Sequence, residues 1–489
     1  MTIRTSLRIG AMTNIMGRLM MLNAFILLLP MVVSIIYGEH DWLSFMHAIV
    51  ASTLLGGILM VTTRHKRESI RAREGFIITA FIWIFYGMIG IIPLMTCENP
   101  LNFTDAVFEI ISGFTTTGAS VIRDVDSMSH GILFWRAFTQ WIGGLGIILL
   151  LLAVMPELNK AAGISMFHAE ATGILHSKLH PRIQQTAWSI WGVYITITIA
   201  SIILLWAGPM DLFDSVCQTM SAIATGGFVT HNAGIQYWDS RYVEIVIIVV
   251  MYLAGLNFLI LFNVGKGNFK AFYNNTVVRV YTGIIIGLSL LVWISTLING
   301  MAAEQEYLPL HQLFHVIAAI TSTGFAAPGV EQWGPFTLIV TILLMCIGAC
   351  AGSTTGGMKV DRAIVLWQNL RNEVSITAFP RRTHVVKLNG SALNNSLLTR
   401  VSAFVAVYFI IIMISTGIIS MAGYGLSDSL FASFSAMGCN GLGYGVTGAE
   451  GSYAVFPVGV KWTLIGMMLM GRLEIFTFLV LFTPGFWRR

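Results

Sequence analysis

One short sequence occurs four times in this chain, and it limits the fold more than any other feature. The copies centre on Gly118, Gly227, Gly324 and Gly441. Thirteen residues before these glycines stand, in order, Asp105, Asp214, His311 and Asp428. Because the spacing has no gap, each copy predicts a helix of about three turns. The helix is capped at its start by the polar residue and ends in a loop of small and hydroxylated residues.

The composition places these four copies in a membrane. Of the 489 residues, 56% are hydrophobic and 10% are charged, whereas about a quarter of the residues in a soluble domain are charged. The first apolar run, 19–36, is longer than a signal-peptide core and lacks a small-residue cleavage site, so we expect it to be retained as a span. The chain is therefore expected to be a polytopic membrane protein.

Runs of about 20 apolar residues predict ten membrane crossings. They lie at 19–36, 45–62, 75–94, 134–155, 187–207, 243–264, 277–298, 336–367, 400–421 and 460–483, of which 336–367 is interrupted. The basic cluster at 64–73 indicates a cytoplasmic loop, because Lys and Arg concentrate on that side. Both termini are then cytoplasmic, and the net charge of +5 is a signal of topology rather than of nucleic-acid binding.

Each copy lies between two spans, so successive units have the same orientation. Parallel units are related by an axis along the membrane normal. We therefore predict an all-α membrane protein with about ten transmembrane helices and four parallel helix–pore loop–helix repeats around one pore. The predicted parts are two extra N-terminal helices in 1–73 and the repeats 74–185, 186–274, 275–399 and 400–489.

The four loops predict a selectivity filter. Carbonyl and hydroxyl oxygens can replace the water shell of a cation, and a central glycine permits the backbone angles that this requires. The short helices also direct their negative C-terminal ends toward the pore axis. The candidate filter residues are Thr116, Thr117, Gly118, Thr225, Gly226, Gly227, Ser322, Thr323, Gly324, Cys439, Asn440 and Gly441.

The interrupted span predicts a gate. Segment 348–357 contains four glycines, each of which costs a helix about 1 kcal/mol relative to alanine. Irregular backbone at membrane depth persists only inside protein or beside a watery cavity, so we expect a loop beneath the filter. Arg472 interrupts an apolar run and is expected to face the pore, with carbonyls of this loop as its acceptors. The candidate gate residues are Gly348, Gly352, Ser353, Gly356, Gly357, Lys359 and Arg472.

Several other patterns indicate no site in this chain. Asp105, Asp214 and Asp428 are interpreted as helix caps rather than as ion-attracting residues. Cys346 and Cys350 lack nearby ligands for a metal. The glycine run 441–445 follows no strand, so it does not predict a dinucleotide loop. The sequence has no catalytic constellation, and we do not expect an enzyme.

With these motifs the chain resembles the Trk/Ktr/HKT superfamily of potassium transporters. The resemblance covers nearly the whole length and rests on the four filter loops and on the runs 135–146, 351–359 and 471–474. The two extra leading spans favour the Trk branch. Glycine at all four filter centres favours potassium, because in plant relatives a serine at the first centre accompanies sodium transport. Cys439 and Asn440 depart from the hydroxylated pair of the first loop.

The resemblance implies potassium uptake across the bacterial inner membrane by a homodimer with one pore per chain. It also implies cytosolic nucleotide-binding regulatory subunits of the TrkA type, so that a nucleotide would bind the partner and potassium would be the substrate. No cofactor is expected in this chain, and the only other partner expected is membrane lipid, not nucleic acid.

Three alternatives stay open from the sequence. The chain could be a gated channel, a cation symporter that uses proton or sodium coupling, or a scaffold or sensor that transports nothing. Segments 156–186 and 372–399, which include Arg381 and Arg382, could be solvated connectors or the docking surface of the partner.

Overall fold

The computed structural model describes residues 7–63, 72–146, 183–300, 308–379, 385–448, 451–473 and 475–488. Within these residues the chain is almost entirely helical. The helices before the first loop and in the first repeat are α1 (Ile9–Ile26), α2 (Leu28–Ile36), α3 (Trp42–Thr62), α4 (Ala72–Thr96), α5 (Phe103–Phe114) and α6 (His130–Leu145). The second repeat contains α9 (Ile183–Trp206), α10 (Leu212–Ala224), η2 (Gly234–Trp238), α11 (Arg241–Ala254), α12 (Phe258–Gly265) and α13 (Lys270–Tyr273).

The third and fourth repeats follow the same order of a long helix, a short helix and a broken helix. The third contains α14 (Thr276–Ile298), α15 (Leu308–Ile320), η4 (Val330–Trp333), α16 (Pro335–Ile347) and α17 (Val360–Ala378). A two-residue Asn389-Gly390 turn, with both residues left-handed, joins β1 (Lys387–Leu388) to β2 (Ser391–Ala392). The fourth contains α18 (Asn395–Met421), α19 (Leu426–Gly438), η5 (Gly445–Thr447), η6 (Tyr453–Val455), α20 (Val458–Arg472), α21 (Ile475–Val480) and α22 (Pro484–Arg488).

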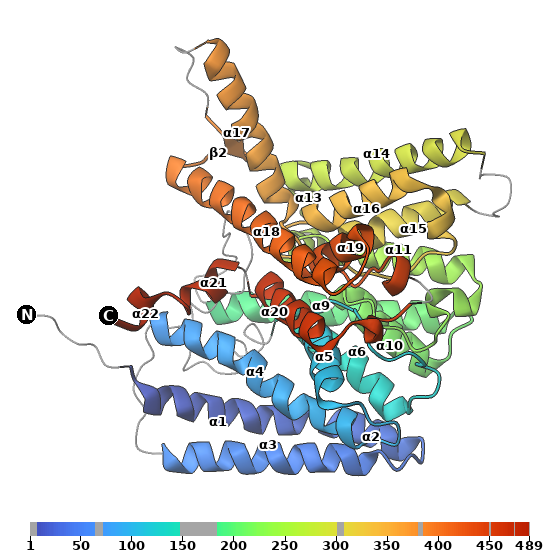
Figure 1. Cartoon of the computed structure of the whole chain (residues 1–489), viewed down its shortest axis with the longest axis vertical. Helices are drawn as coiled ribbons and strands as arrows, with labels where there is room; N and C mark the ends of the chain where they lie inside the picture. Colours follow the sequence, from blue (N-terminus) through green and yellow to red (C-terminus); the bar gives the residue numbers. More distant parts are fainter. Residues whose placement is uncertain are drawn as a thin grey trace, which may run out of the picture.

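Short helices of the first and second repeats lie near the middle of the molecule, between two groups of helices on its opposite sides. Figure 1 shows α1, α2 and α3 along one side, α14, α15 and α16 along the opposite side, and α5, α6, α10 and α20 between them. The outer helices α3, α14 and α18 carry large exposed apolar side chains such as Ile58, Ile294 and Met413. An apolar outer surface is what contact with lipid requires, so the fold is that of a multi-pass membrane protein.

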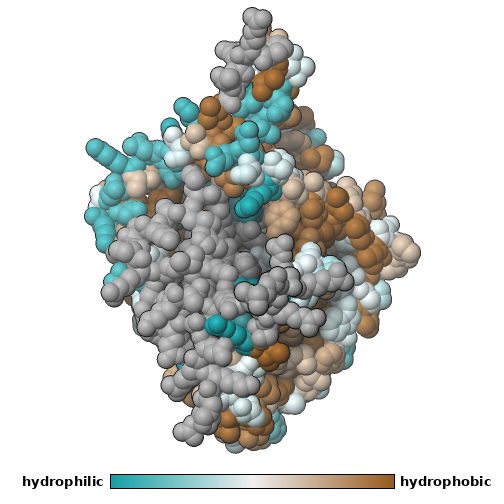
Figure 2. Space-filling view, turned by 90° about the vertical axis from the view of Figure 1, so that its left-hand side faces the viewer, coloured by the Kyte–Doolittle hydropathy of each residue, from teal (hydrophilic) through white to brown (hydrophobic). Residues whose placement is uncertain are grey.

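Both ends of the described chain lie on the same side of the molecule. Helix α22 and the first turn of α1 are both at the left of Figure 1, and α17 projects at the top of the same view. Seen from that side, hydrophilic residues gather in the upper part of the view, and hydrophobic residues lie mainly along its right and lower margins (Figure 2). The arrangement agrees with an even number of crossings.

Among the described residues, six helices are long and apolar enough to cross a membrane, or seven if the bent pair α11 and α12 forms one span. The predicted span 243–264 is bent, because α11 and α12 meet at 105°. Asn257 caps α12 by accepting from the Leu259 N–H at 2.8 Å, and Phe258 donates to the Gly352 carbonyl at 3.1 Å. These bonds satisfy backbone groups that a straight helix would have paired internally.

The second helices of the third and fourth repeats are also interrupted. The predicted interruption of 336–367 is confirmed, because no helix spans 348–359 between α16 and α17. The predicted run 460–483 is divided, because α20 ends at Arg472 and α21 begins at Ile475. Helix α6 ends at Leu145, and the rest of the predicted span 134–155 lies outside the described residues beyond Gly146. Glu474, Arg381, Arg382 and most of 156–186 also lie outside them.

Helices α1 and α3 pack through two facing glycines. A Cβ atom on Gly56 would lie 2.9 Å from the Gly17 carbonyl oxygen, and a Cβ on Gly17 would lie 2.9 Å from that of Gly56. The neighbouring Gly57 has no atom within 4 Å of an added Cβ. The contact is therefore too close for any larger side chain on either helix.

Replacing Gly56 by leucine is expected to separate α1 from α3 and to lower the free energy of unfolding by about 1–3 kcal/mol through overpacking. Gly57→Leu adds the same side chain in open space and is the matched control. The measurement is the unfolding temperature in detergent, where equal values for the two variants would contradict this packing.

Candidate functional site

The four short helices end in the same backbone motif. The residue two positions before each central glycine has left-handed backbone angles. Its N–H donates to the carbonyl three residues earlier, and the N–H of the following residue donates to the carbonyl five residues before itself. This is a Schellman cap, whose left-handed position usually holds glycine. Here the position is occupied by Thr116 (φ 55°), Thr225 (φ 54°), Ser322 (φ 51°) and Cys439 (φ 48°). Non-glycine residues in this conformation store strain, and such strain concentrates at functional sites.

The central glycines form a closed ring. Their φ values are +81° for Gly118, +84° for Gly227, +78° for Gly324 and +77° for Gly441. A Cβ atom on any of these glycines would overlap a main-chain carbonyl oxygen of the next loop. The overlap is with Gly226 for Gly118, with Thr323 for Gly227, with Asn440 for Gly324 and with Thr117 for Gly441. Since the fourth contact returns to the first loop, all four loops surround one axis with their backbones in contact.

Helix packing builds this ring. Each short helix packs against the second helix of the preceding repeat: α10 on α6, α15 on α11, α19 on α16 and α5 on α20. The last of these pairs joins the fourth repeat to the first. The predicted arrangement of four repeats around one axis therefore appears both in the helices and in the loops.

The side chains of the ring differ between opposite pairs of loops. In the first and third loops two threonine hydroxyls, two residues apart, form a hydrogen bond at 2.8 Å. The pairs are Thr115 with Thr117 and Thr321 with Thr323. The second loop has Gly226 instead. In the fourth loop, Asn440 donates through Nδ2 to the Ala319 carbonyl at 2.7 Å. The ring therefore has four similar backbones but only two hydroxyl pairs.

Two side-chain oxygens of the ring lack a partner among the described residues, Thr116 Oγ1 and Asn440 Oδ1. The Thr116 hydroxyl is buried and, within the described residues, makes no hydrogen bond. Buried hydroxyls are normally bonded to protein, water or an ion. The position is therefore a place where a bound species could contribute the missing contact.

The broken segment between α16 and α17 lies directly against the ring. Gly356 N–H donates to Ser322 Oγ at 2.6 Å, and Thr354 Oγ1 donates to the Ile223 carbonyl at 3.1 Å. A Cβ on Gly356 would overlap the Gly438 carbonyl oxygen. The segment thus contacts the ends of the short helices in the second, third and fourth repeats.

The remaining candidate gate residues hold this segment in shape. Gly348, Gly352 and Gly357 have φ values of +68°, +77° and +75°. Gly352 lies against Asn257, whose Nδ2 donates to the Ala351 carbonyl at 2.8 Å. Ser353 Oγ donates to the Cys350 carbonyl at 2.6 Å, and buried Lys359 donates to the hydroxyl and carbonyl of Thr355.

Arg472 connects this segment to the first repeat. Its guanidinium donates to the Thr354 carbonyl at 2.7 Å and to the carbonyls of Gly144, at 2.6 Å, and Gly143. The predicted acceptors on the broken segment are present. The acceptors on α6 were not predicted, although the glycine pair at the end of that helix signals exposed carbonyls there. The side chain of Arg472 therefore links the broken segment to the first repeat as well.

The interpretation of three aspartates as helix caps is wrong. The N-cap residues are Asn102, Asp211 and Gly425, three residues earlier in each case. Asp105 and Asp214 instead occupy the first turn, where the helix dipole favours a carboxylate. Asp105 pairs with Lys461 at 2.6 Å and Asp214 with His231 at 3.1 Å. These partners were not predicted from the sequence, because Lys461 and His231 stand at different distances along the chain from the central glycine before them.

His311 occupies the corresponding position in the third repeat, where it pairs with Glu244 of α11 at 2.9 Å. Pairs of this kind therefore connect the starts of three short helices to their surroundings. They lie at the opposite end of those helices from the ring.

The ring offers oxygen ligands rather than a metal-binding cluster of side chains. No group of three or more His, Cys, Asp or Glu residues that could hold a metal occurs in the part of the chain that is described. The five cysteines are buried and free. Main-chain carbonyls and hydroxyls are ligands that suit a hard, weakly held cation.

The comparisons with known proteins identify the family. The TrkH family model, described as "Cation transport protein", matches residues 43–488. The Trk system potassium uptake protein TrkH of Salmonella typhimurium is 35% identical over 98% of this chain and 99% of that protein, and its Escherichia coli K12 counterpart is 34% identical over the same shares. The crystal structure of the potassium transporter TrkH from Vibrio parahaemolyticus has a TM-score of 0.87 at 29% identity, covering 98% of this chain and all of that one. This chain belongs to the TrkH family of cation transport proteins.

Proposed function

We propose that this protein takes up potassium ions across the bacterial inner membrane, through the axis of the four-loop ring. The observation that carries the proposal is the closed series of contacts between each central glycine and the next loop. Its relatives are named potassium uptake proteins. A ring of backbone contacts fixes the spacing of main-chain oxygens, and that spacing is what replaces a hydration shell.

The filter consists of the twelve residues from Thr116–Gly118, Thr225–Gly227, Ser322–Gly324 and Cys439–Gly441. The C-terminal ends of α5, α10, α15 and α19 add partial negative charge near the axis. The unpartnered Thr116 hydroxyl supports an ion or water position just below the glycines. In this proposal potassium is the substrate, and the chain itself needs no cofactor and catalyses no reaction.

The segment 348–357 acts as the gate, with Arg472 and Lys359 as its charged elements. The segment crosses beneath the filter, and Arg472 holds it to α6 through carbonyls of both. Opening requires these hydrogen bonds to break and the segment to withdraw. A positive charge just below the filter also opposes an occupying cation.

Regulation is assigned to partners. We place N- and C-termini in the cytoplasm, where nucleotide-binding subunits of the TrkA type would dock on 156–186 or 372–399, and we expect the chain to act as a homodimer. A symporter with proton or sodium coupling is the competing mechanism. Single-channel currents in a bilayer containing both potassium and sodium support the channel, whereas fixed-stoichiometry coupled flux would overturn it.

Replacing Gly118 by serine is expected to abolish uptake or to lower the preference for potassium over sodium. The residue has φ +81°, and an added Cβ would overlap the Gly226 carbonyl oxygen. The measurement is the permeability ratio in reconstituted bilayers. Gly283→Ser is the matched control, since a Cβ at Gly283 meets no atom within 4 Å. An unchanged ratio in well-folded Gly118→Ser protein would refute the filter.

Replacing Arg472 by alanine is expected to raise flux in the absence of any regulatory subunit, because the tether and the charge are both removed. Arg472→Lys keeps the charge but loses the forked donor geometry, so its flux is expected to be intermediate. Channel recordings with ion preference as a second readout provide the test. If neither Arg472→Ala nor a variant with a shortened 348–357 segment conducts more than the parent protein, the gate lies elsewhere.

Reversing Arg381 and Arg382 to glutamate is expected to weaken capture of a purified TrkA-type subunit while leaving ion preference unchanged. The control is the reversal of Lys266 and Lys270 to glutamate, which changes the net charge by the same amount in another predicted cytoplasmic connector. Equal capture by the two double variants would show that the arginines only orient the chain in the membrane.

A further inference from the structure

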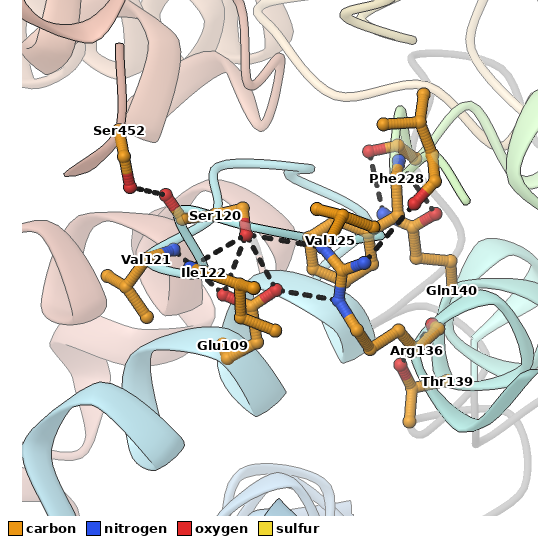
Figure 3. Close-up of polar contacts among 12 residues, drawn as sticks. Glu109, Ser120, Val121, Ile122, Val125, Arg136, Thr139, Gln140, Phe228 and Ser452 are labelled. Atoms are coloured by element: carbon orange, nitrogen blue, oxygen red, sulfur yellow. Dashed lines mark hydrogen bonds and ion pairs between the residues drawn. The ribbon is translucent and has the colours of Figure 1, made fainter. Parts of the chain in front are cut away.

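A buried ion pair lies behind the first loop of the ring. Arg136 of α6 donates through Nε to Glu109 Oε1 of α5 at 2.8 Å, and the two side chains are only 2% and 0% exposed. Such a pair is costly to bury unless its remaining hydrogen-bonding groups are also satisfied. Figure 3 shows that these groups are satisfied by the loops themselves.

Glu109 holds the segment that leaves the first loop. Its Oε2 accepts from the Val121 N–H at 2.9 Å, and its Oε1 accepts from Ser120 Oγ at 2.9 Å. Arg136 Nη2 donates to the same Ser120 hydroxyl at 3.2 Å. Ser120 and Val121 are the second and third residues after Gly118, so both charges of the pair fix the exit of this loop.

Arg136 also reaches the second loop. Its Nη1 donates to the Val229 carbonyl at 3.2 Å, and its guanidinium carbon lies 4.2 Å from the centre of the Phe228 ring. Phe228 and Val229 follow Gly227 directly. The ion pair therefore spans the junction between two neighbouring loops.

Gln140, one turn after Arg136 on α6, completes the connection. Its Nε2 donates to the Gly226 carbonyl at 2.8 Å, and its Oε1 accepts from the Phe228 N–H at 3.3 Å. The Gly226 carbonyl is the one against which Gly118 is packed. One face of α6 thus holds the backbone on both sides of Gly227 and, through Glu109, the exit of the first loop.

The other three repeats lack this charge. Nine residues before the central glycines stand Glu109, Gln218, His315 and Ala432, in chain order. Gln218 donates to Thr230 Oγ1 at 3.1 Å, and His315 lies 2.8 Å from Thr341 Oγ1. Only the first position carries a carboxylate, so one junction of the ring is held by full charges.

We propose that Glu109, Arg136 and Gln140 are positioning residues that set the spacing between the first and second loops and so determine cation preference. None of them binds the ion in this proposal. It rests on the proposed function, because the spacing matters only if the ring is the filter. The first and second loops would then respond together to any change in the pair.

The test is the potassium-to-sodium permeability ratio of reconstituted Glu109→Asp and Glu109→Gln proteins. Asp keeps the charge but withdraws the carboxylate by one methylene group, and Gln keeps the length but removes the charge. Both are expected to lower the ratio by about tenfold, a change of the size produced by one lost positioning contact. If Glu109→Gln does not fold because Arg136 is left unpaired, Glu109→Asp and the double variant Glu109→Gln/Arg136→Gln carry the test.

Asp105→Asn is the control variant. This substitution breaks the ion pair between Asp105 and Lys461. Like the pair of Glu109 and Arg136, this pair is largely buried, and it joins α5 to the fourth repeat, but among the described residues neither side chain bonds to the loops of the ring. It is expected to lower the unfolding temperature without changing the ratio. A parental ratio in folded Glu109 variants would overturn the inference, as would an equal loss in Asp105→Asn. If the parent itself fails to discriminate, the proposed function fails instead.

Discussion

The close contact of four backbones around one axis is the constraint on which the rest of the structure depends. Each loop must bring a carbonyl oxygen against the Cα of the next loop's glycine, so no side chain fits at Gly118, Gly227, Gly324 or Gly441. The residue two before each glycine must also be left-handed, at a cost of about 1–2 kcal/mol for a residue with a Cβ. Rigid surroundings must balance this strain, and the packing of each short helix on the preceding repeat provides them.

The interruptions of the second helices follow from the same need. A continuous helix pairs its own backbone groups and offers none to a neighbour, whereas α6, α11 and α16 end beside the ring, so their last carbonyls can bond to other segments. Asn257 and Arg472 bond to the broken segment from other repeats, and Ser322 bonds to it from within the third repeat. The region beside the ring is therefore held partly by hydrogen bonds between segments, which can be exchanged for others.

Two buried ion pairs connect separate loops or repeats. Breaking a buried pair by removing one partner costs about 3–5 kcal/mol, because the other charge is left uncompensated. Glu109 with Arg136 connects two loops, and Asp105 with Lys461 connects the first and fourth repeats. In a membrane protein, where apolar packing discriminates poorly between helices and lipid, such pairs select which elements meet.

The sequence alone determined the parts of this protein that repeat or that violate a local rule. The fixed spacing before four glycines predicted the short helices, their loops and the ring, and the glycines of 348–357 predicted the broken helix, because a helix cannot tolerate them. Tertiary structure decided the rest. A single Asn257 gave no local signal for the bend of 105° between α11 and α12, and the true N-cap residues lie three residues before the aspartates that were taken as caps. The partners of Arg136 on the second loop and of Arg472 on α6 could not be predicted, because these acceptors, on Val229, Gly143 and Gly144, are main-chain carbonyls. Every residue carries such a carbonyl, and only the fold determines which of them stay unpaired.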